Sequence, residues 1–434
     1  MATYLDDAFW CKIPAFSQVS EDEFIDYKWQ IKHSVCNEPN LIKTIKDIAP
    51  DEFIKAACQG FSKTPMAVRI TPYLLSLINW RDPWHDPICK QFIPTSNQLM
   101  EDHPMLRLDS LHELKDAIAP GLIHRYAHKA LFLPLDTCPA YCRFCTRSYA
   151  VGRDTNIVKK VNLPIAPQRW KEAFNYIESH PELEDVAISG GDTYNLSAEH
   201  IKAIGFRLLQ IPHIRRIRFA TRGIAVMPMK ILSDEKWLKA ITSVLNLGRQ
   251  LHKEVALHTH FNHASEITSI TQLAMNQLFE LGLVVRNQTV LLRGVNDTAS
   301  QMQLLIKRLS YINIQPYYVY QHDLVKGVED LRTSVETAIK LEKNVRGVAA
   351  GFNTPTFVLD TPGGGGKRCI HSYEYYNRET GVSVYTAPAV KPGQYFLYFD
   401  PLHSLKVEIR AAWQDPKKRE EMCSEALKEV IPVP

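Results

Sequence analysis

The sequence predicts an α/β protein: a partial TIM-type (β/α)6 barrel with an N-terminal helical region and a small C-terminal extension. From Lys129 onward, short apolar strands alternate with segments whose apolar residues recur every three or four positions. Six such strand–helix units in succession imply a parallel sheet, which right-handed crossovers curl in one direction. A doubly wound open sheet is the alternative fold. Polar residues at the C-terminal ends of the strands are expected to carry the chemistry.

The units of the barrel can be assigned from this alternation. Ser197 and Ser265 stand where helix N-caps are expected. The predicted strands are 129–136, 185–189, 214–220, 254–260, 284–292 and 314–321, and the predicted helices are 167–180, 197–211, 234–251, 265–281, 298–311 and 334–346.

The chain divides into three predicted regions. Residues 1–125 are mostly helical, with helical periodicity in Ser20–Ser34 and Asn40–Ala49. Residues 126–347 form the barrel. Residues 348–434 contain a glycine-rich segment, a hairpin-like stretch at 373–385, a proline-rich linker at 386–394 and a charged tail.

Composition excludes several classes of protein. Of 434 residues, 45% are hydrophobic and 23% are charged, and the net charge is only +4, so no nucleic-acid partner is expected. No apolar run reaches membrane-spanning length, and the first ten residues lack the pattern of a signal peptide. Six of the nine cysteines are scattered singly and three are clustered, as in a reduced protein with one thiol site. A cytoplasmic protein without a membrane partner is therefore expected.

The clustered cysteines directly follow the first predicted barrel strand, as Cys138-Pro-Ala-Tyr-Cys142-Arg-Phe-Cys145. Three thiolates at this spacing can hold three irons of a 4Fe-4S cluster and leave the fourth iron open to a ligand. A zinc site is one alternative, although it normally needs four closed ligands. Chance proximity of buried cysteines is the other. The motif after strand one of a βα barrel resembles the radical S-adenosylmethionine superfamily.

A glycine-rich segment, Ser189-Gly190-Gly191-Asp192, ends the second predicted strand. By resemblance to the superfamily, these four residues lie near the methionine moiety of S-adenosylmethionine. Glycines there would let the backbone approach the ligand closely, and the acid could accept an ammonium group. The same residues also form ordinary turns.

Lys367 follows four glycines in Asp360-Thr-Pro-Gly-Gly-Gly-Gly-Lys367. A phosphate-binding P-loop would need glycine at Thr361 and serine or threonine at Arg368, so that motif fails twice. The glycines are expected to form a mobile arm whose lysine can make a Schiff base with an aldehyde cofactor. A flexible exposed loop without a function is the alternative.

Taken in order, these motifs resemble the lysine 2,3-aminomutase family over much of residues 120–367. In that family the lysine after the glycines carries pyridoxal 5'-phosphate, which assigns this role to Lys367. The resemblance therefore implies an isomerase with a 4Fe-4S cluster, S-adenosyl-L-methionine and pyridoxal phosphate. The matching segments are 120–126, 142–147, 189–192, 259–263, 287–297, 317–324 and Pro362–Lys367.

The resemblance also implies roles in binding the substrate. Arg147 matches the arginine that binds the substrate carboxylate, and its planar fork suits bidentate binding. Asp323 and Asp360 match two aspartates that hold a distal ammonium group. Glutamate 2,3-aminomutases replace these acids, so both acids together imply a cationic side chain. Without the resemblance, Asp323 could be a strand-end cap and Asp360 a turn residue.

Three further assignments rest on the resemblance alone. His260 and Gln288 match residues that contact S-adenosylmethionine, and Arg125 matches a residue near the phosphate of pyridoxal phosphate. Lys129 replaces a second arginine of the family.

The C-terminal cysteine motif that holds zinc in well-known members is missing here: the tail has only Cys423, and Thr298 replaces another cysteine. Zinc is therefore not expected.

The resulting functional hypothesis is a 2,3-aminomutase that moves the α-amino group of a cationic amino acid, with L-lysine favoured, to the β-carbon. Arginine 2,3-aminomutase is an alternative, as is a radical enzyme that modifies a lysine of a partner protein. A non-catalytic zinc protein would need a fourth ligand, which the sequence does not show. The expected partners are a free amino acid, an electron donor such as flavodoxin or ferredoxin, and further copies of the chain in a homo-oligomer.

Overall fold

The computed structural model describes residues 4–431, and its largest element is a ten-stranded sheet with the strands in sequence order. The strands from β3 to β9 are parallel, while β1, β2 and β10 pair antiparallel at the two ends. The strands are β1 (Ala117–Ala119), β2 (Leu122–Tyr126), β3 (Lys129–Phe132), β4 (Asp185–Ile188), β5 (Arg216–Ala220), β6 (Glu254–Thr259), β7 (Val284–Val290), β8 (Gln315–Tyr320), β9 (Thr356–Thr361) and β10 (Gly366–Cys369).

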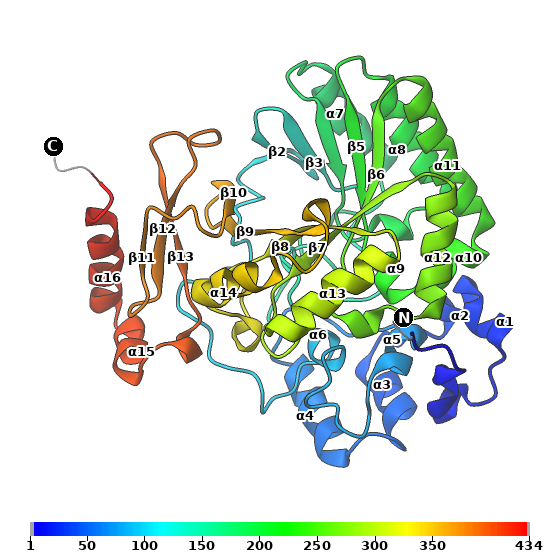
Figure 1. The fold of residues 1–434 in the computed structure, drawn as a ribbon, viewed down its shortest axis with the longest axis horizontal. Coiled ribbons are helices and arrows are strands. Elements are labelled where there is room, and N and C mark those ends of the chain that lie inside the picture. The colour runs from blue at the N-terminus through cyan, green and yellow to red at the C-terminus, as the bar shows by residue number, and fades with distance from the viewer. Residues whose placement is uncertain (1–3, 432–434) are drawn as a thin grey trace.

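Within the described residues, no pairing joins β1 to β10, so the barrel is partial, as predicted. Six strand–helix units from β3 to α14 are confirmed, and β9 adds a parallel strand that was not predicted. Figure 1 shows the sheet with helices along its outside. The helices after the barrel strands are α7 (Pro167–Glu178), α8 (Ala198–Gln210), α9 (Gly223–Val226), α10 (Met229–Ser233), α11 (Glu235–Gln250), α12 (Ser269–Glu280), α13 (Ala299–Tyr311) and α14 (Val335–Val345).

Side-chain caps define where several of these helices begin. Ser197 accepts a hydrogen bond from the His200 backbone N–H, as predicted for an N-cap. The prediction for Ser265 is wrong. It lies inside a short 3-10 helix, and α12 begins after Thr268, whose hydroxyl accepts from the Thr271 backbone N–H.

The core of the barrel lies between the sheet and these helices. Ile188, Phe219 and Leu257, on neighbouring strands, are almost completely buried. The long helices present apolar stripes to the sheet, as Ile201, Ile204 and Leu208 do on α8. This packing fixes the direction of the strands, so that their C-terminal ends lie along one edge of the sheet.

The N-terminal helices lie at the end of the barrel where the parallel strands finish (Figure 1), and Gln91 there donates to Glu266 and accepts from Arg222. The stretch Ser20–Ser34, where the periodicity predicts helical structure, forms two helices, because Asp26 is extended and its carboxylate caps the second. The helices are α1 (Glu21–Ile25), α2 (Tyr27–Lys32), α3 (Glu38–Ile45), α4 (Asp51–Phe61), α5 (Pro72–Leu77) and α6 (Cys89–Phe92). The 3-10 helices are η1 (Phe9–Lys12), η2 (Pro14–Phe16), η3 (Thr193–Asn195), η4 (Ala264–Glu266), η5 (Glu329–Leu331), η6 (Gly351–Asn353) and η7 (Leu402–Ser404).

The C-terminal extension is a three-stranded antiparallel sheet followed by two helices, at one end of the molecule in Figure 1. The strands are β11 (Tyr375–Asn377), β12 (Val382–Thr386) and β13 (Tyr395–Phe399), and the helices are α15 (Val407–Gln414) and α16 (Pro416–Lys428). The hairpin-like stretch is confirmed, and the proline-rich linker leads into a third strand that was not predicted. No helix in residues 4–431 combines the length and the apolar character needed to cross a membrane.

Candidate active site

A cavity of about 390 Å³ opens at the C-terminal ends of the parallel strands. Its volume lies in the range of sites for small molecules. All of the site residues predicted from the sequence line it, although they come from segments far apart in the chain. They are Arg125, Cys138, Cys142, Cys145, Arg147, Ser189, Gly190, Gly191, Asp192, His260, Gln288, Asp323, Asp360 and Lys367.

The three cysteines lie in the loop between β3 and α7 and face the cavity. Burial raises the pKa of Cys145 to about 11 and also raises the pKa values of Cys138 and Cys142. Among residues 4–431, no three His, Cys, Asp or Glu side chains are close enough together to hold a single metal ion. Cysteines bound to separate irons of a cluster need not be that close, because each ligates a different metal.

The Gly-Gly-Asp segment packs its backbone against the start of the cysteine loop. Gly191 N–H donates to the Leu135 carbonyl at 2.7 Å, and Asp192 N–H donates to the Thr137 carbonyl at 2.9 Å. A Cβ on Gly191 would lie 2.3 Å from the Thr137 carbonyl oxygen, so a larger residue could not fit. The Asp192 carboxylate accepts from the backbone N–H groups of Tyr194 and Arg222. In this structure the segment holds the cysteine loop in place.

Lys367 lies opposite Asp360 in the antiparallel pairing of β9 and β10. Its Nζ is 3.0 Å from Asp360 Oδ2. Burial by itself would lower the pKa of Lys367, but the Asp360 carboxylate outweighs it and holds this pKa well above its ordinary value. Gly363, Gly364 and Gly365 lie in the hairpin turn between the strands, and Gly366 begins β10; Gly363, Gly364 and Gly366 have positive φ.

Two buried aspartates face the cavity with unused acceptor atoms. Asp323 Oδ2 accepts from the Thr146 hydroxyl at 2.5 Å, while Asp323 Oδ1 and Asp360 Oδ1 are buried and have no hydrogen-bond partner among residues 4–431. Burial and the nearby Asp360 carboxylate raise the pKa of Asp323 to about 7. Unpaired carboxylate oxygens that are buried in one cavity carry a desolvation cost, which a bound cation would offset.

Arg147 is held by an acid that the sequence analysis did not identify. Its Nε and Nη2 donate to the two oxygens of Glu113 at 2.8 and 2.7 Å, and the Tyr149 hydroxyl donates to the same carboxylate. Glu113 is almost fully buried, whereas Arg147 is 21% exposed. This pair does not use Nη1 of Arg147, so that side of the guanidinium can bind a second carboxylate.

The residues matched to cofactor contacts lie around the rest of the cavity. Arg125, on β2, forms an ion pair with Asp116 at 2.6 Å. His260 follows β6, and burial together with Arg222 lowers its pKa to about 3, so that the ring is neutral. Gln288, on β7, lies 3.4 Å from the ring of His258.

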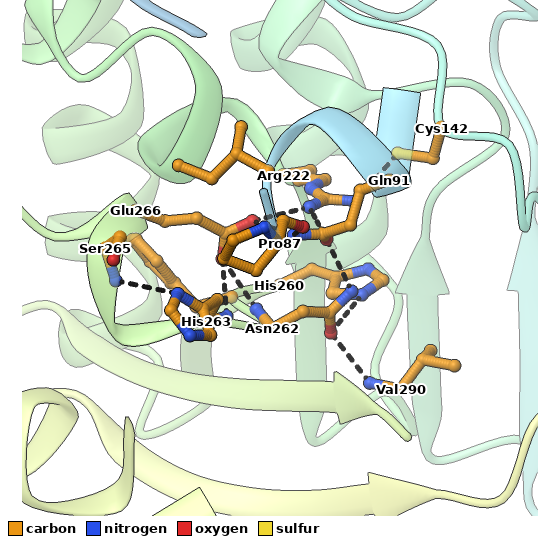
Figure 2. Close-up of polar contacts among 12 residues, drawn as sticks. Pro87, Gln91, Cys142, Arg222, His260, Asn262, His263, Ser265, Glu266 and Val290 are labelled. Atoms are coloured by element: carbon orange, nitrogen blue, oxygen red, sulfur yellow. Dashed lines mark hydrogen bonds and ion pairs between the residues drawn. The ribbon is translucent and has the colours of Figure 1, made fainter. Parts of the chain in front are cut away.

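Arg222 and Glu266 were also missed by the sequence analysis. Figure 2 shows Arg222 between Cys142 and Glu266, with Gln91, Asn262 and His260 in the same polar network. Arg222 comes two residues after the end of β5, where the barrel fold predicts functional residues. Its position could therefore have identified it. Glu113 had no such signal, because it lies in an irregular segment before the sheet.

The sequence is similar to curated enzymes of one reaction type. It is 38% identical to the L-lysine 2,3-aminomutase of Clostridium subterminale over 352 residues, which cover 81% of this chain and 79% of that one. It is 35% identical to the L-lysine 2,3-aminomutase of Fusobacterium nucleatum over 385 residues, 86% of this chain and 85% of the other. A glutamate 2,3-aminomutase of Clostridioides difficile is 31% identical over 357 residues, 82% and 79% of the two chains. No model of a protein family matches the sequence.

The partial barrel and the cysteine loop, together with these relatives, define an enzyme of the radical S-adenosylmethionine superfamily. The reaction common to the relatives is a 2,3-aminomutase reaction, which makes the chain an isomerase that acts on an amino acid. The chain belongs to the lysine 2,3-aminomutase family.

Proposed function

We propose that this enzyme moves the α-amino group of a cationic amino acid, with L-lysine favoured, to the β-carbon. The observation that carries the proposal is the pair of buried, unpartnered oxygens, Asp323 Oδ1 and Asp360 Oδ1, in one cavity. A distal ammonium group would satisfy both, whereas a distal carboxylate would be repelled by both. The relatives named for lysine favour lysine over arginine.

The cavity residues fit the three cofactors that the family implies. Cys138, Cys142 and Cys145 would hold a 4Fe-4S cluster, and Lys367 would hold pyridoxal phosphate, with Arg125 near its phosphate. Ser189–Asp192, His260 and Gln288 would surround S-adenosylmethionine. When bound, the cluster with S-adenosylmethionine supplies hydrogen-atom abstraction, and pyridoxal phosphate supplies a conjugated system through which nitrogen can move between neighbouring carbons.

The protein's own side chains would orient the substrate from its two ends. Nη1 of Arg147 would bind the substrate carboxylate, while Glu113 fixes the guanidinium from the other side. Asp323 and Asp360 would bind the distal ammonium. Since Asp360 also holds the protonated amine of Lys367, occupation of that lysine by a cofactor would free the Asp360 carboxylate for the substrate. This arrangement fixes the reacting carbons between two charged anchors.

Arginine is a second candidate substrate, because two separate carboxylates can each accept from a guanidinium. Asp323 and Asp360 each have one unpaired oxygen, and two such acceptors suit a guanidinium as well as a single ammonium group. Competition between lysine and arginine in one reaction mixture distinguishes them. Lysine is expected to have the higher kcat/KM.

Removing either acid should weaken substrate binding. In Asp323→Asn and Asp360→Asn, the distal ammonium group of the substrate loses one of its two carboxylate partners. Removing one partner of a buried ion pair typically costs about 3–5 kcal/mol. The KM for lysine should therefore rise about a hundredfold or more. Asp185→Asn is a matched control, because Asp185 is a buried strand acid that is paired with Arg218 instead. Equal KM values for lysine in all three variants and the unmodified enzyme would contradict the proposed binding of the cation.

The substrate affinity should also depend on pH through Asp323. Its pKa is raised to about 7, so protonation at lower pH removes the negative charge that pairs with the substrate. We expect kcat/KM for lysine to fall as the pH drops through about 7. In Asp360→Asn a neighbouring negative charge is absent, the pKa of Asp323 falls, and the inflection should move to lower pH. An unchanged inflection in the variant would show that Asp323 is not the titrating group.

A further inference from the structure

Arg222 contacts a cysteine of the proposed cluster directly. Its Nη1 donates to Cys142 Sγ at 2.8 Å, and Figure 2 shows the guanidinium between this sulfur and Glu266. The side chain is only 8% exposed, and its guanidinium lies over the rings of Phe92 and Phe144, 4.8 and 5.2 Å from their centroids. The contact is therefore shielded from water, where an electrostatic interaction is strongest.

The guanidinium is fixed in this position by further hydrogen bonds. Nη2 donates to Gln91 Oε1 at 2.6 Å and to Glu266 Oε1 at 2.8 Å. Glu266 is itself fully buried, and its other oxygen accepts from the backbone N–H groups of Asn262 and His263. The arginine is thus positioned before any ligand binds.

We propose that Arg222 is a positioning residue that raises the reduction potential of the cluster through Cys142. This inference rests on the proposed function, because it requires the cluster at the three cysteines. The oxidised cluster, [4Fe-4S]2+, takes one electron from an external low-potential one-electron donor and becomes [4Fe-4S]1+. The added negative charge spreads onto the sulfur ligands, where a charged donor stabilises the reduced form more than the oxidised form.

Glu266 is expected to lower the reduction potential of the cluster. Its carboxylate partly cancels the charge of Arg222, so the potential reflects the balance of the pair. A purely structural arginine would only need to bind Gln91 and Glu266. The donor on Cys142 is the feature that links the pair to electron transfer.

The test is a redox titration of the reconstituted, full-length enzyme, followed by the electron paramagnetic resonance signal of the reduced cluster. Arg222→Gln removes the charge, and Arg222→Lys keeps it with a single donor nitrogen. For Arg222→Gln we expect at least a tenfold lower equilibrium constant for reduction, which is about 59 mV for one electron. Arg222→Lys should show a smaller loss. Glu266→Gln should shift the potential in the opposite direction.

Arg332→Gln is the matched control, because Arg332 is also a buried arginine in an ion pair, with Glu329 at 2.7 Å, but donates no hydrogen bond to a cysteine among residues 4–431. Its potential should equal that of the unmodified enzyme. If Arg222→Gln does not retain iron, the reduction potential of Arg222→Lys alone tests whether the arginine raises the potential of the cluster. Variants of Arg222 that retain iron and titrate like the unmodified enzyme would overturn the inference, as would a shift of Glu266→Gln in the same direction as Arg222→Gln. Failure of the unmodified enzyme to form a cluster would instead overturn the proposed function.

Discussion

Replacing Lys367 with alanine is expected to abolish turnover and covalent capture of pyridoxal phosphate. Lys367 lies in the cavity across from Asp360, and the loss of a group that forms a covalent bond to a cofactor typically costs about a thousandfold or more in rate. Borohydride treatment of the unmodified enzyme loaded with pyridoxal phosphate should fix the cofactor on the peptide that contains Lys367. Mass spectrometry of the digested protein identifies this peptide.

Lys129 provides the control, because it is a second lysine that lines the same cavity. Burial and the nearby Lys367 lower its pKa, which favours the neutral amine relative to an exposed lysine. We expect Lys129→Ala to retain covalent capture on Lys367. Recovery of the cofactor on Lys129 in the unmodified enzyme would contradict the assignment.

Replacement of Cys138, Cys142 or Cys145 with alanine should have an effect of similar size. Each thiolate would hold a different iron, so the loss of one should abolish the brown absorbance of the reconstituted protein and the cleavage of S-adenosylmethionine. Cys423, in α16, does not line the cavity, so Cys423→Ala should retain both the absorbance and the cleavage.

Metal analysis of the unmodified protein should find iron at cluster stoichiometry and zinc at background. A full equivalent of tightly bound zinc would show that the cysteines or the tail serve another purpose.

Much of the barrel could be predicted because its signal is local. Each of the six predicted strands is a short, largely apolar run followed by an amphipathic helix, as β6 and α12 illustrate. The fold then brings the strand ends together, which is why motifs as distant as Cys138 and Lys367 could be expected in one cavity. The short β1 and β2 strands lacked this signal, because they pair antiparallel at the edge of the sheet with little alternation.

The parts of the site that could not be predicted depend on tertiary contacts. Glu113 reaches Arg147 from an irregular segment, and nothing in its local sequence distinguishes it from a surface acid. The pair of Arg222 and Glu266 joins the ends of different strand–helix units, so neither residue identifies the other. The glycines before Lys367 indicated conformational freedom, but only the pairing of β9 with β10 shows that they form a hairpin turn.

The most direct test of the account is to identify the substrate. The reconstituted enzyme should be incubated without oxygen with S-adenosylmethionine, pyridoxal phosphate, a chemical reductant and lysine, arginine or glutamate, and the products identified by nuclear magnetic resonance. Because two buried acids with unpaired oxygens line the cavity, we expect lysine to be converted fastest, to the isomer with its amino group on the β-carbon. Faster conversion of glutamate or of a neutral amino acid would contradict the account.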